Sequence, residues 1–285
     1  MTEGSKKTID TGTNELLCDI ADRVATITLN RPEKRNALSD HLTPALRATL
    51  LALETRQDVG CIVVTGAGKA FCAGGDVGGM NSNNKDADQT APTQVSAPSM
   101  EERIRTLIHK QETLTLRLAD HAKPTIAALP GPAAGAGFCI ALACDLRIAA
   151  ESAFVTTAYR NIGFSGDYGG SWLLTQLVGP ARAKELFYTA RRVGGEEGLA
   201  LGIFNQVVPD DQLHDAAQSM ARQIAAGPPI ALGYMKENIN RAIGGDLRTC
   251  LAMEADRLMR CAATDDHREA VAAFLEKRTP TFYGR

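Results

Sequence analysis

The stretch GAGKAFCAGGDV at residues 66–77 follows an apolar, β-branched run at residues 61–65. A second glycine-rich stretch, PGPAAGAG at residues 130–137, follows the apolar run at residues 125–129 and opens an apolar helix. Such strand-turn-helix junctions leave backbone N–H groups uncovered, and the helix dipole adds positive potential there. Two of them can direct one N–H each at a single oxygen. The pair therefore predicts an oxyanion hole made of main chain, which stabilises charge developing on a carbonyl.

Simpler explanations of these stretches can be tested by spacing. Ordinary βα turns also use glycine, because it tolerates positive φ, and that interpretation stays open for either stretch alone. A dinucleotide-binding fingerprint does not fit, since Phe71 and Ile140 stand where its third glycine should be. A P-loop does not fit either, because Val63 and Ala70 occupy two of its required positions. The stretch at 163–167 has its second glycine one residue too early for a nucleophile elbow.

The composition bounds the class of protein. A chain of 285 residues with 44% hydrophobic and 22% charged residues can bury one large core, as a soluble globular protein does. The net charge of −2 argues against a nucleic-acid partner, and no apolar run approaches the length of a transmembrane helix. The polar N-terminus has no signal core, so we expect a cytoplasmic protein without a membrane partner. None of the seven cysteines forms a CxxC pair, so we expect reduced thiols and no metal site.

Apolar strands alternate with amphipathic helices through the first two thirds of the chain, which predicts an α/β fold with parallel, covered sheets. Besides the strands at 61–65 and 125–129, we expect a hairpin of strands at 16–19 and 24–29, and further strands at 145–149 and 153–157. We expect a helix that carries Leu42, Leu46, Leu50 and Leu53 on one face with Ser39 as its cap, an amphipathic helix at 100–118 and a helix at 136–144. The polar segment at 81–99 is expected to be a mobile loop. After about residue 170 the pattern is mostly helical, with one short strand at 203–208.

Four motifs in this order resemble the crotonase superfamily, also called the enoyl-CoA hydratase/isomerase family. They are LNRPEKRNAL at 29–38, KAFCAGGD at 69–76, the glycine turn at 131–137 followed by CDL at 144–146, and AFLEKRTPTF at 273–282. The resemblance covers residues 15–284. It implies a crotonase-like spiral of ββα units with the acyl-CoA site over residues 1–195, and a helical trimerisation region over residues 196–285. It also implies a homotrimer or a dimer of trimers, and no cofactor beyond the coenzyme A that is part of the substrate.

The resemblance assigns roles to individual residues. The backbone N–H groups of Gly75 and Ala136 match the two donors of the family's oxyanion hole. Lys34 and Arg35 match a stretch beside the coenzyme A phosphates, although a solvated basic turn is an equal alternative. Phe274, Lys277 and Phe282 match positions that pack against coenzyme A, often that of a neighbouring subunit, whereas a packed helix with an exposed lysine would need no ligand. The remaining substrate-contacting positions are Ala37, Ala73, Gly74, Asp76, Val77, Gly135 and Tyr159.

The chain departs from the family at the two glutamates that hydratases use. Cys139 and Tyr159 stand at those positions, and with ordinary pKa values near 8.5 and 10 neither replaces a carboxylate easily. Asp167 remains, at a place where some family members carry a working aspartate. A single base suits migration of a double bond better than addition of water. Alternatively, Asp167 only caps the following helix. Asp76 is a competing base, but it also lies at a helix start, where a capping role is expected.

We therefore expect an enzyme that acts on an acyl-CoA thioester through a stabilised enolate, and favour double-bond isomerisation with Asp167 as base. The missing glutamates make hydratase activity doubtful. Two alternatives stay open at this point. One is a non-catalytic protein on the same scaffold that binds acyl-CoA or RNA, and the other is a thioester hydrolase or carbon–carbon lyase.

Overall fold

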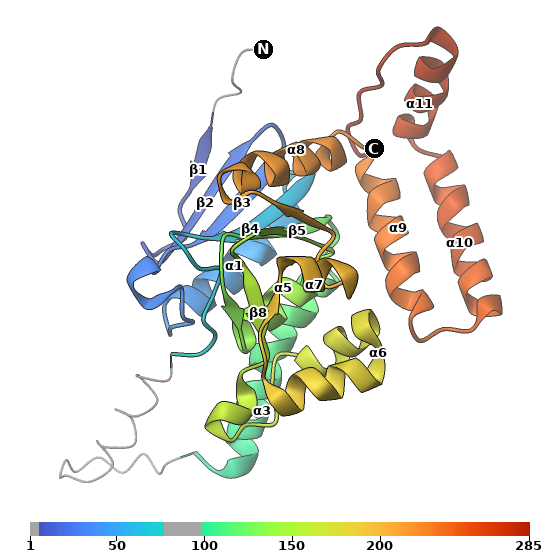
Figure 1. Ribbon diagram of the computed structural model, residues 1–285. Coiled ribbons are helices and arrows are strands. Elements are labelled where there is room, and N and C mark those ends of the chain that lie inside the picture. Colours follow the sequence, from blue (N-terminus) through green and yellow to red (C-terminus); the bar gives the residue numbers. More distant parts are fainter. Residues whose placement is uncertain (1–5, 77–97) are drawn as a thin grey trace.

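A seven-stranded sheet forms the centre of the molecule (Figure 1). The computed structural model describes residues 6–76 and 98–285. The strands lie in the order β1 (Lys7–Ile9), β2 (Leu16–Ala21), β3 (Val24–Leu29), β4 (Cys61–Gly66), β5 (Thr125–Leu129), β7 (Leu146–Ala150) and β10 (Gln206–Val208). The first three pair antiparallel, and every pair from β3 onward is parallel. Buried and mostly apolar side chains fill the central parallel strands β4, β5 and β7, as a sheet covered on both faces requires.

A small second sheet contains β6 (Ala133–Ala134), β8 (Phe154–Thr156) and β9 (Val193–Gly194). The chain passes from β5 in the large sheet to β6 in the small one and then into α5 (Ala136–Ala143). It repeats this path from β7 through β8 to α6 (Gly170–Thr189). A single bridge between Cys72 and Ala133 continues the small sheet beyond β6, toward the turn after β4. These repeated steps form the expected spiral of ββα units, and the α/β fold class is confirmed.

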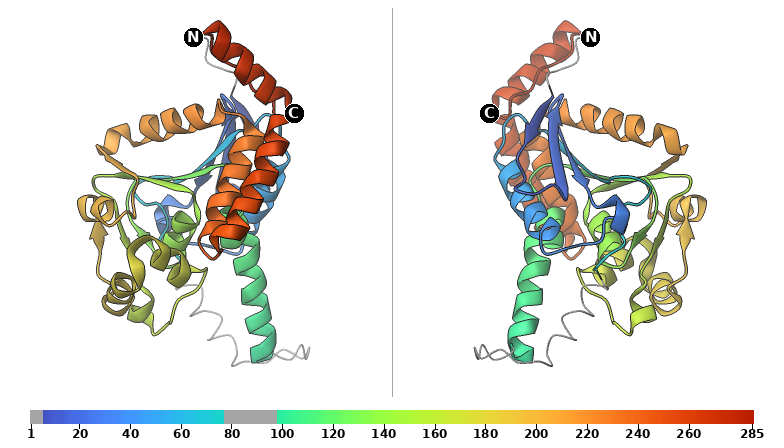
Figure 2. Two further views of the ribbon diagram at one scale, coloured as in Figure 1. Left: turned by 90° about the vertical axis from the view of Figure 1, so that its right-hand side faces the viewer. Right: turned by 90° about the vertical axis from the view of Figure 1, so that its left-hand side faces the viewer.

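Helices cover both faces of the large sheet. Figure 2 shows α8 (Leu213–Ala225) lying across one face, where it contacts β3, β4, β5 and β7. On α1 (Leu42–Glu54) the leucines predicted to share a face are all buried. The N-cap residue of this helix is His41 rather than the predicted Ser39, which lies two residues earlier and whose Oγ accepts from the Leu42 amide at 2.9 Å.

Among the remaining helical segments, only the helix at 100–118 had predicted bounds. These segments are α3 (Met100–Gln111), η3 (Glu112–Leu116), α4 (Arg117–Ala119), α7 (Gly195–Ala200), α9 (Pro229–Ala242), α10 (Leu247–Ala262), α11 (Asp265–Glu276) and the single turns η1 (Pro32–Lys34), η4 (Tyr159–Ile162) and η5 (Asp210–Gln212). The helix expected at 100–118 passes through the π-helical turn η3, and α6 is interrupted at Gly179, which has a φ of 73° ahead of Pro180. The strand expected at 203–208 is confined to its last three residues.

The last helices, α9 and α10, stand away from the sheet and contain no buried side chain (Figure 1). The expected division at residue 195 stays a prediction, and the large sheet takes β10 and its covering helix α8 from beyond it. The loop expected at 81–99 and Val77 fall on residues 77–97, outside the described residues. Among the described helices, none is both long and apolar enough to span a membrane.

Replacing Leu50 by alanine should lower the free energy of unfolding by about 2–5 kcal/mol, because this α1 side chain is fully buried and leaves a cavity. Its neighbour Leu51 is 54% exposed and provides a matched control, for which we expect a change of no more than about 0.5 kcal/mol. Urea unfolding followed by circular dichroism measures both. Equal losses in the two variants would contradict the described orientation of α1.

Candidate active site

The two glycine turns meet through their backbones. The Ala134 amide donates to the Cys72 carbonyl at 2.9 Å, and the Phe71 amide donates to the Pro132 carbonyl at 3.0 Å. Gly74 has a φ of 89°, and a Cβ there would lie 2.8 Å from the Ala134 carbonyl oxygen. Only glycine allows this approach together with a left-handed backbone. The turn after β4 is thereby fixed against the start of α5.

The predicted oxyanion donors are brought together by this contact. Ala136 is the first residue of α5, so its amide precedes the helical hydrogen bonds, and Gly135 before it has a φ of 51°. The Gly75 backbone is held by the strand at Leu38, whose amide donates to the Gly74 carbonyl at 2.8 Å. Neither the Gly75 nor the Ala136 amide donates to another group in the described chain. Both face one cavity, and they are therefore available to a ligand oxygen.

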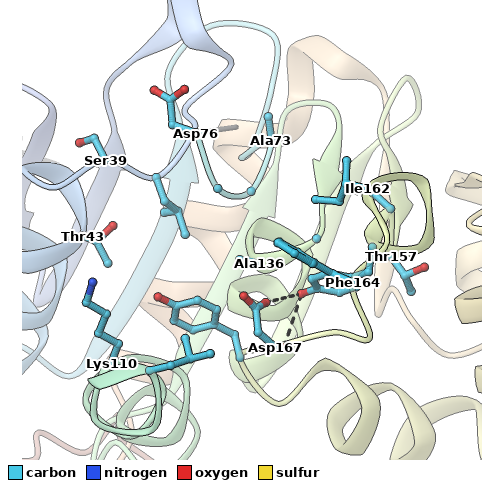
Figure 3. Close-up of a pocket in the computed structure, with 18 of the residues that line it drawn as sticks. Ser39, Thr43, Ala73, Asp76, Lys110, Ala136, Thr157, Ile162, Phe164 and Asp167 are labelled. Atoms are coloured by element: carbon cyan, nitrogen blue, oxygen red, sulfur yellow. Dashed lines mark hydrogen bonds between the residues drawn. The ribbon is translucent and has the colours of Figure 1, made fainter. Parts of the chain in front are cut away.

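This cavity has a volume of about 660 Å³, which suits a small acyl group. It is lined by both turns, by residues from the 38–47 and 157–168 segments, and by two side chains of α3. Figure 3 shows Ser39, Thr43 and Lys110 on one side, Ile162 and Phe164 on the other, with Ala136 and Asp167 between them. We refer to it below as the acyl cavity.

Asp167 lies in this cavity at the end of a short hydrogen-bond network. The Tyr159 hydroxyl donates to Asp167 Oδ1 at 2.7 Å, and Cys139 Sγ lies 3.1 Å from the same hydroxyl. The Tyr159 ring is buried and stacks on Phe187 with 6.0 Å between ring centroids, so packing fixes the hydroxyl that orients Asp167. Cys139 and Tyr159 are thus placed to hold the carboxylate of Asp167.

Burial determines the protonation of this network. It raises the pKa of the Cys139 thiol to about 12 and also raises the pKa of the Tyr159 phenol, so both stay protonated at neutral pH. Burial also raises the pKa of Asp167 above its ordinary value, and the hydrogen bond from Tyr159 acts in the opposite direction. A carboxyl group whose pKa lies nearer to neutral is a better general base than an exposed one.

The capping alternative for Asp167 is wrong. Helix α6 begins at Gly170 with Gly169 as its N-cap, and no side chain caps it. Asp76, the competing carboxylate, also lines the acyl cavity, and its Oδ2 lies 3.3 Å from Arg31 Nη2. Its expected helix follows in residues outside the described range.

A second, smaller hollow of about 380 Å³ opens beside the acyl cavity and shares Ala73 and Asn161 with it. Three cationic side chains line this hollow: Arg35, Lys69 and Arg192. We refer to it as the cationic hollow. Arg35 was predicted beside the coenzyme A phosphates, whereas the sequence analysis did not identify Lys69 and Arg192 as site residues. Lys69 lies within a quoted motif, but no local signal identifies Arg192, which packs with its Cζ 4.4 Å from the Phe154 ring centroid.

Several predicted contacts lie elsewhere in the described chain. Lys34 lines neither cavity. Ala37 is buried, and its carbonyl accepts from Arg31 Nη1 at 2.6 Å. On and after α11, Phe274 is 83% exposed and Phe282 is buried, and neither they nor Lys277 line the two cavities of this single chain. Their roles toward coenzyme A stay predictions.

Comparison with known proteins agrees with this geometry. The family model for enoyl-CoA hydratase/isomerase matches residues 19–285. The 1,2-epoxyphenylacetyl-CoA isomerase of Escherichia coli is 38% identical over 95% of this chain and 98% of its own length. The short-chain-enoyl-CoA hydratase of Clostridium acetobutylicum is 32% identical over 93% of this chain and 96% of its own. The crystal structure of enoyl-CoA hydratase from Bacillus anthracis superposes with a TM-score of 0.84 at 34% identity, covering 95% of this chain and all of that one.

These similarities extend over nearly the whole chain, including both glycine turns and the C-terminal helices. The chain belongs to the enoyl-CoA hydratase/isomerase family, and the predicted membership of the crotonase superfamily is confirmed.

Asp167→Asn should raise the free energy of unfolding at neutral pH. Between the ordinary pKa of an aspartate, about 3.9, and the raised pKa of the folded protein, the native state holds a proton that the unfolded state has released. The free energy of unfolding therefore falls as pH rises through that window. Asparagine removes this pH-dependent loss, and its side-chain oxygen still accepts a hydrogen bond from the Tyr159 hydroxyl.

Urea unfolding at pH 7 and at pH 3.5 measures this difference, which should vanish at the lower pH. Asp210→Asn is the control of opposite sign, because hydrogen bonds from Ser152 lower the pKa of Asp210. A stability loss in Asp167→Asn as large as that in Asp210→Asn would contradict the raised pKa.

Proposed function

We propose that this protein is an acyl-CoA isomerase that moves a double bond through an enolate, with Asp167 as the base. The observation that carries the proposal is the convergence in one cavity of two available amides, from Gly75 and Ala136, with the half-buried carboxylate of Asp167. The two amides can hold the carbonyl oxygen of a thioester. A nearby base can then act on the α- and γ-carbons of the acyl chain.

In the proposed reaction, the thioester oxygen accepts hydrogen bonds from the Gly75 and Ala136 amides. Asp167 removes a proton from the γ-carbon, which is bonded to the far end of the C2–C3 double bond of a 2-enoyl thioester, or from the α-carbon of a 3-enoyl thioester in the reverse sense. The electron pair moves into the thioester, and the amides stabilise the resulting oxyanion. Asp167 then returns the proton to the other carbon, so the double bond migrates and no atom is gained or lost.

Addition of water to a double bond would require more acid–base groups in the site. An attacking water must lose a proton while the α-carbon gains one, and two carboxylates can share this work. Here Tyr159 and Cys139 remain protonated and Asp76 is paired with Arg31, so we take Asp167 as the base. The name of the Escherichia coli relative supports isomerisation, whereas that of the Clostridium relative would support hydration. The presence of Cys139 and Tyr159 in the site favours isomerisation.

We further propose that the cationic hollow holds the phosphates of coenzyme A. Arg35, Lys69 and Arg192 line it, and it adjoins the acyl cavity through Ala73 and Asn161, so the pantetheine arm would pass between the two. Guanidinium and ammonium groups are the usual partners of phosphate. The protein needs no other cofactor for this chemistry.

A trimer or a pair of trimers would explain the C-terminal helices. Large apolar side chains on α9, α10 and α11 are exposed in the single chain, among them Ile239, Leu247, Leu251 and Phe274. Surfaces of this kind favour association. We also propose a cytoplasmic location, where a reducing environment suits the seven free cysteines.

Asp167→Asn should lower the rate of double-bond migration between 3-hexenoyl-CoA and 2-hexenoyl-CoA by about 10²-fold or more, because the base is lost. Binding of saturated hexanoyl-CoA should change little, since the amides and cations remain. Turnover by absorbance and binding by calorimetry separate the two effects, and the wild-type rate should rise with pH as Asp167 ionises.

Asp210→Asn is the control for a remote carboxylate. Full activity of Asp167→Asn would disprove the base. Thioester hydrolysis by the wild type would favour the hydrolase alternative, and tight binding without any turnover would favour the non-catalytic one. Ordinary rates of crotonyl-CoA hydration would instead make the protein a hydratase.

Lys69→Gln and Arg192→Gln should each raise the KM for hexenoyl-CoA by about 2- to 5-fold, the effect of one partly exposed ion pair. The same variants should leave the KM for the hexenoyl-pantetheine thioester unchanged, because it lacks the nucleotide phosphates. Lys184→Gln, an exposed position on α6, is the matched control. Equal effects on both thioesters would contradict phosphate binding in the hollow.

A further inference from the structure

Two cationic side chains line the acyl cavity, away from the cationic hollow. Arg47 comes from α1 and Lys110 from α3, and Arg47 Nη2 donates to the Lys110 carbonyl at 3.2 Å, which joins the two helices. Arg47 Nε is buried and has no hydrogen-bond partner in the part of the chain that the structure describes. Figure 3 shows Lys110 on the same side of the cavity as Thr43 and Ser39.

The positive charge on this wall is not neutralised by neighbouring described residues. Among them, neither Arg47 nor Lys110 forms an ion pair within 4.0 Å. Three carboxylates line the cavity. Asp76 is paired with Arg31, Asp167 accepts from Tyr159, and Asp40 is exposed to solvent. The field of Arg47 also reaches the Tyr168 phenol, where it opposes the rise in pKa that burial causes.

A buried guanidinium nitrogen without a partner is costly, and a carboxylate that accepts from the guanidinium fork would remove that cost. We infer that the wall formed by Arg47 and Lys110 binds a carboxylate at the far end of the acyl chain. The protein would then prefer acyl-CoA thioesters of dicarboxylic acids over those of simple fatty acids.

This inference rests on the proposed function, because the amides of Gly75 and Ala136 must hold the thioester for the acyl chain to point at the wall. A phosphate of coenzyme A could supply the same negative charge. However, the cationic hollow already offers three cations to those phosphates, on the other side of Ala73 and Asn161. The acyl carboxylate is therefore the ligand that the second pair of cations fits.

The test measures binding of non-reacting thioesters by calorimetry. Glutaryl-, adipyl- and pimelyl-CoA carry the terminal carboxylate at three lengths, hexanoyl-CoA is the neutral comparison, and free coenzyme A tests the phosphates alone. At least one carboxylated thioester should bind about tenfold or more tightly than hexanoyl-CoA. Arg47→Gln and Lys110→Gln should each remove most of that preference while leaving hexanoyl-CoA binding within about threefold.

Arg105→Gln removes a charge from the exposed part of α3 and should leave the preference intact. Arg47→Lys keeps the charge but not the fork, and should retain part of it, so the test survives if Arg47→Gln does not fold. A wild type without any preference, or a preference that persists in both the Arg47 and Lys110 variants, would overturn the inference. Weaker binding of free coenzyme A in Arg47→Gln would also overturn it, in favour of a phosphate. If hexanoyl-CoA itself does not bind, the proposed function fails first.

Discussion

Direct contact between two backbones determines the geometry on which the rest of this site depends. A Cβ at Gly131 would lie 2.2 Å from the Lys69 carbonyl oxygen, and one at Gly137 would lie 2.4 Å from the Cys72 carbonyl oxygen. These distances leave no room for any side chain, so the hydrogen bonds between the turns require glycine at both positions. Because the turns touch through main chain, the amides of Gly75 and Ala136 have fixed positions relative to each other. Preorganised donors of this kind need no rearrangement as charge develops.

The network around Asp167 shows how two protonated side chains can position one carboxylate. Tyr159 occupies the turn η4, and its hydroxyl, held by ring stacking on Phe187, donates to Asp167. Gly170 leaves room for the Cys139 thiol, since a Cβ there would lie 2.6 Å from its sulfur. Burial shifts the pKa of all three groups upward, but only the carboxyl starts from a value low enough to ionise near neutral pH. Tyr159 and Cys139, which stay protonated, thus support the carboxyl group of Asp167.

The two cavities divide the charges of the site. Positive side chains cluster in the cationic hollow on one side of Ala73, and a second pair lines the acyl cavity. An anionic ligand that carried charge at both ends and a thioester between them would match this distribution.

The sequence by itself determined the periodic strands and the two glycine turns, because each depends on local spacing and on residues that only a special backbone requires. The spiral class of fold and the candidates Gly75, Ala136 and Asp167 came from the resemblance of its motifs to the crotonase superfamily. The sequence did not reveal Lys69, Arg192, Arg47 or Lys110 as cavity residues. A lysine or arginine on a turn or a helix has the same local pattern whether it meets solvent or a cavity. Arg47 and Lys110 are 63 residues apart, and only the packing of α1 against α3 decides that one donates to the carbonyl of the other. The tertiary structure also decided that Asp167 faces the cavity rather than its helix, since that depends on where Tyr159 is buried.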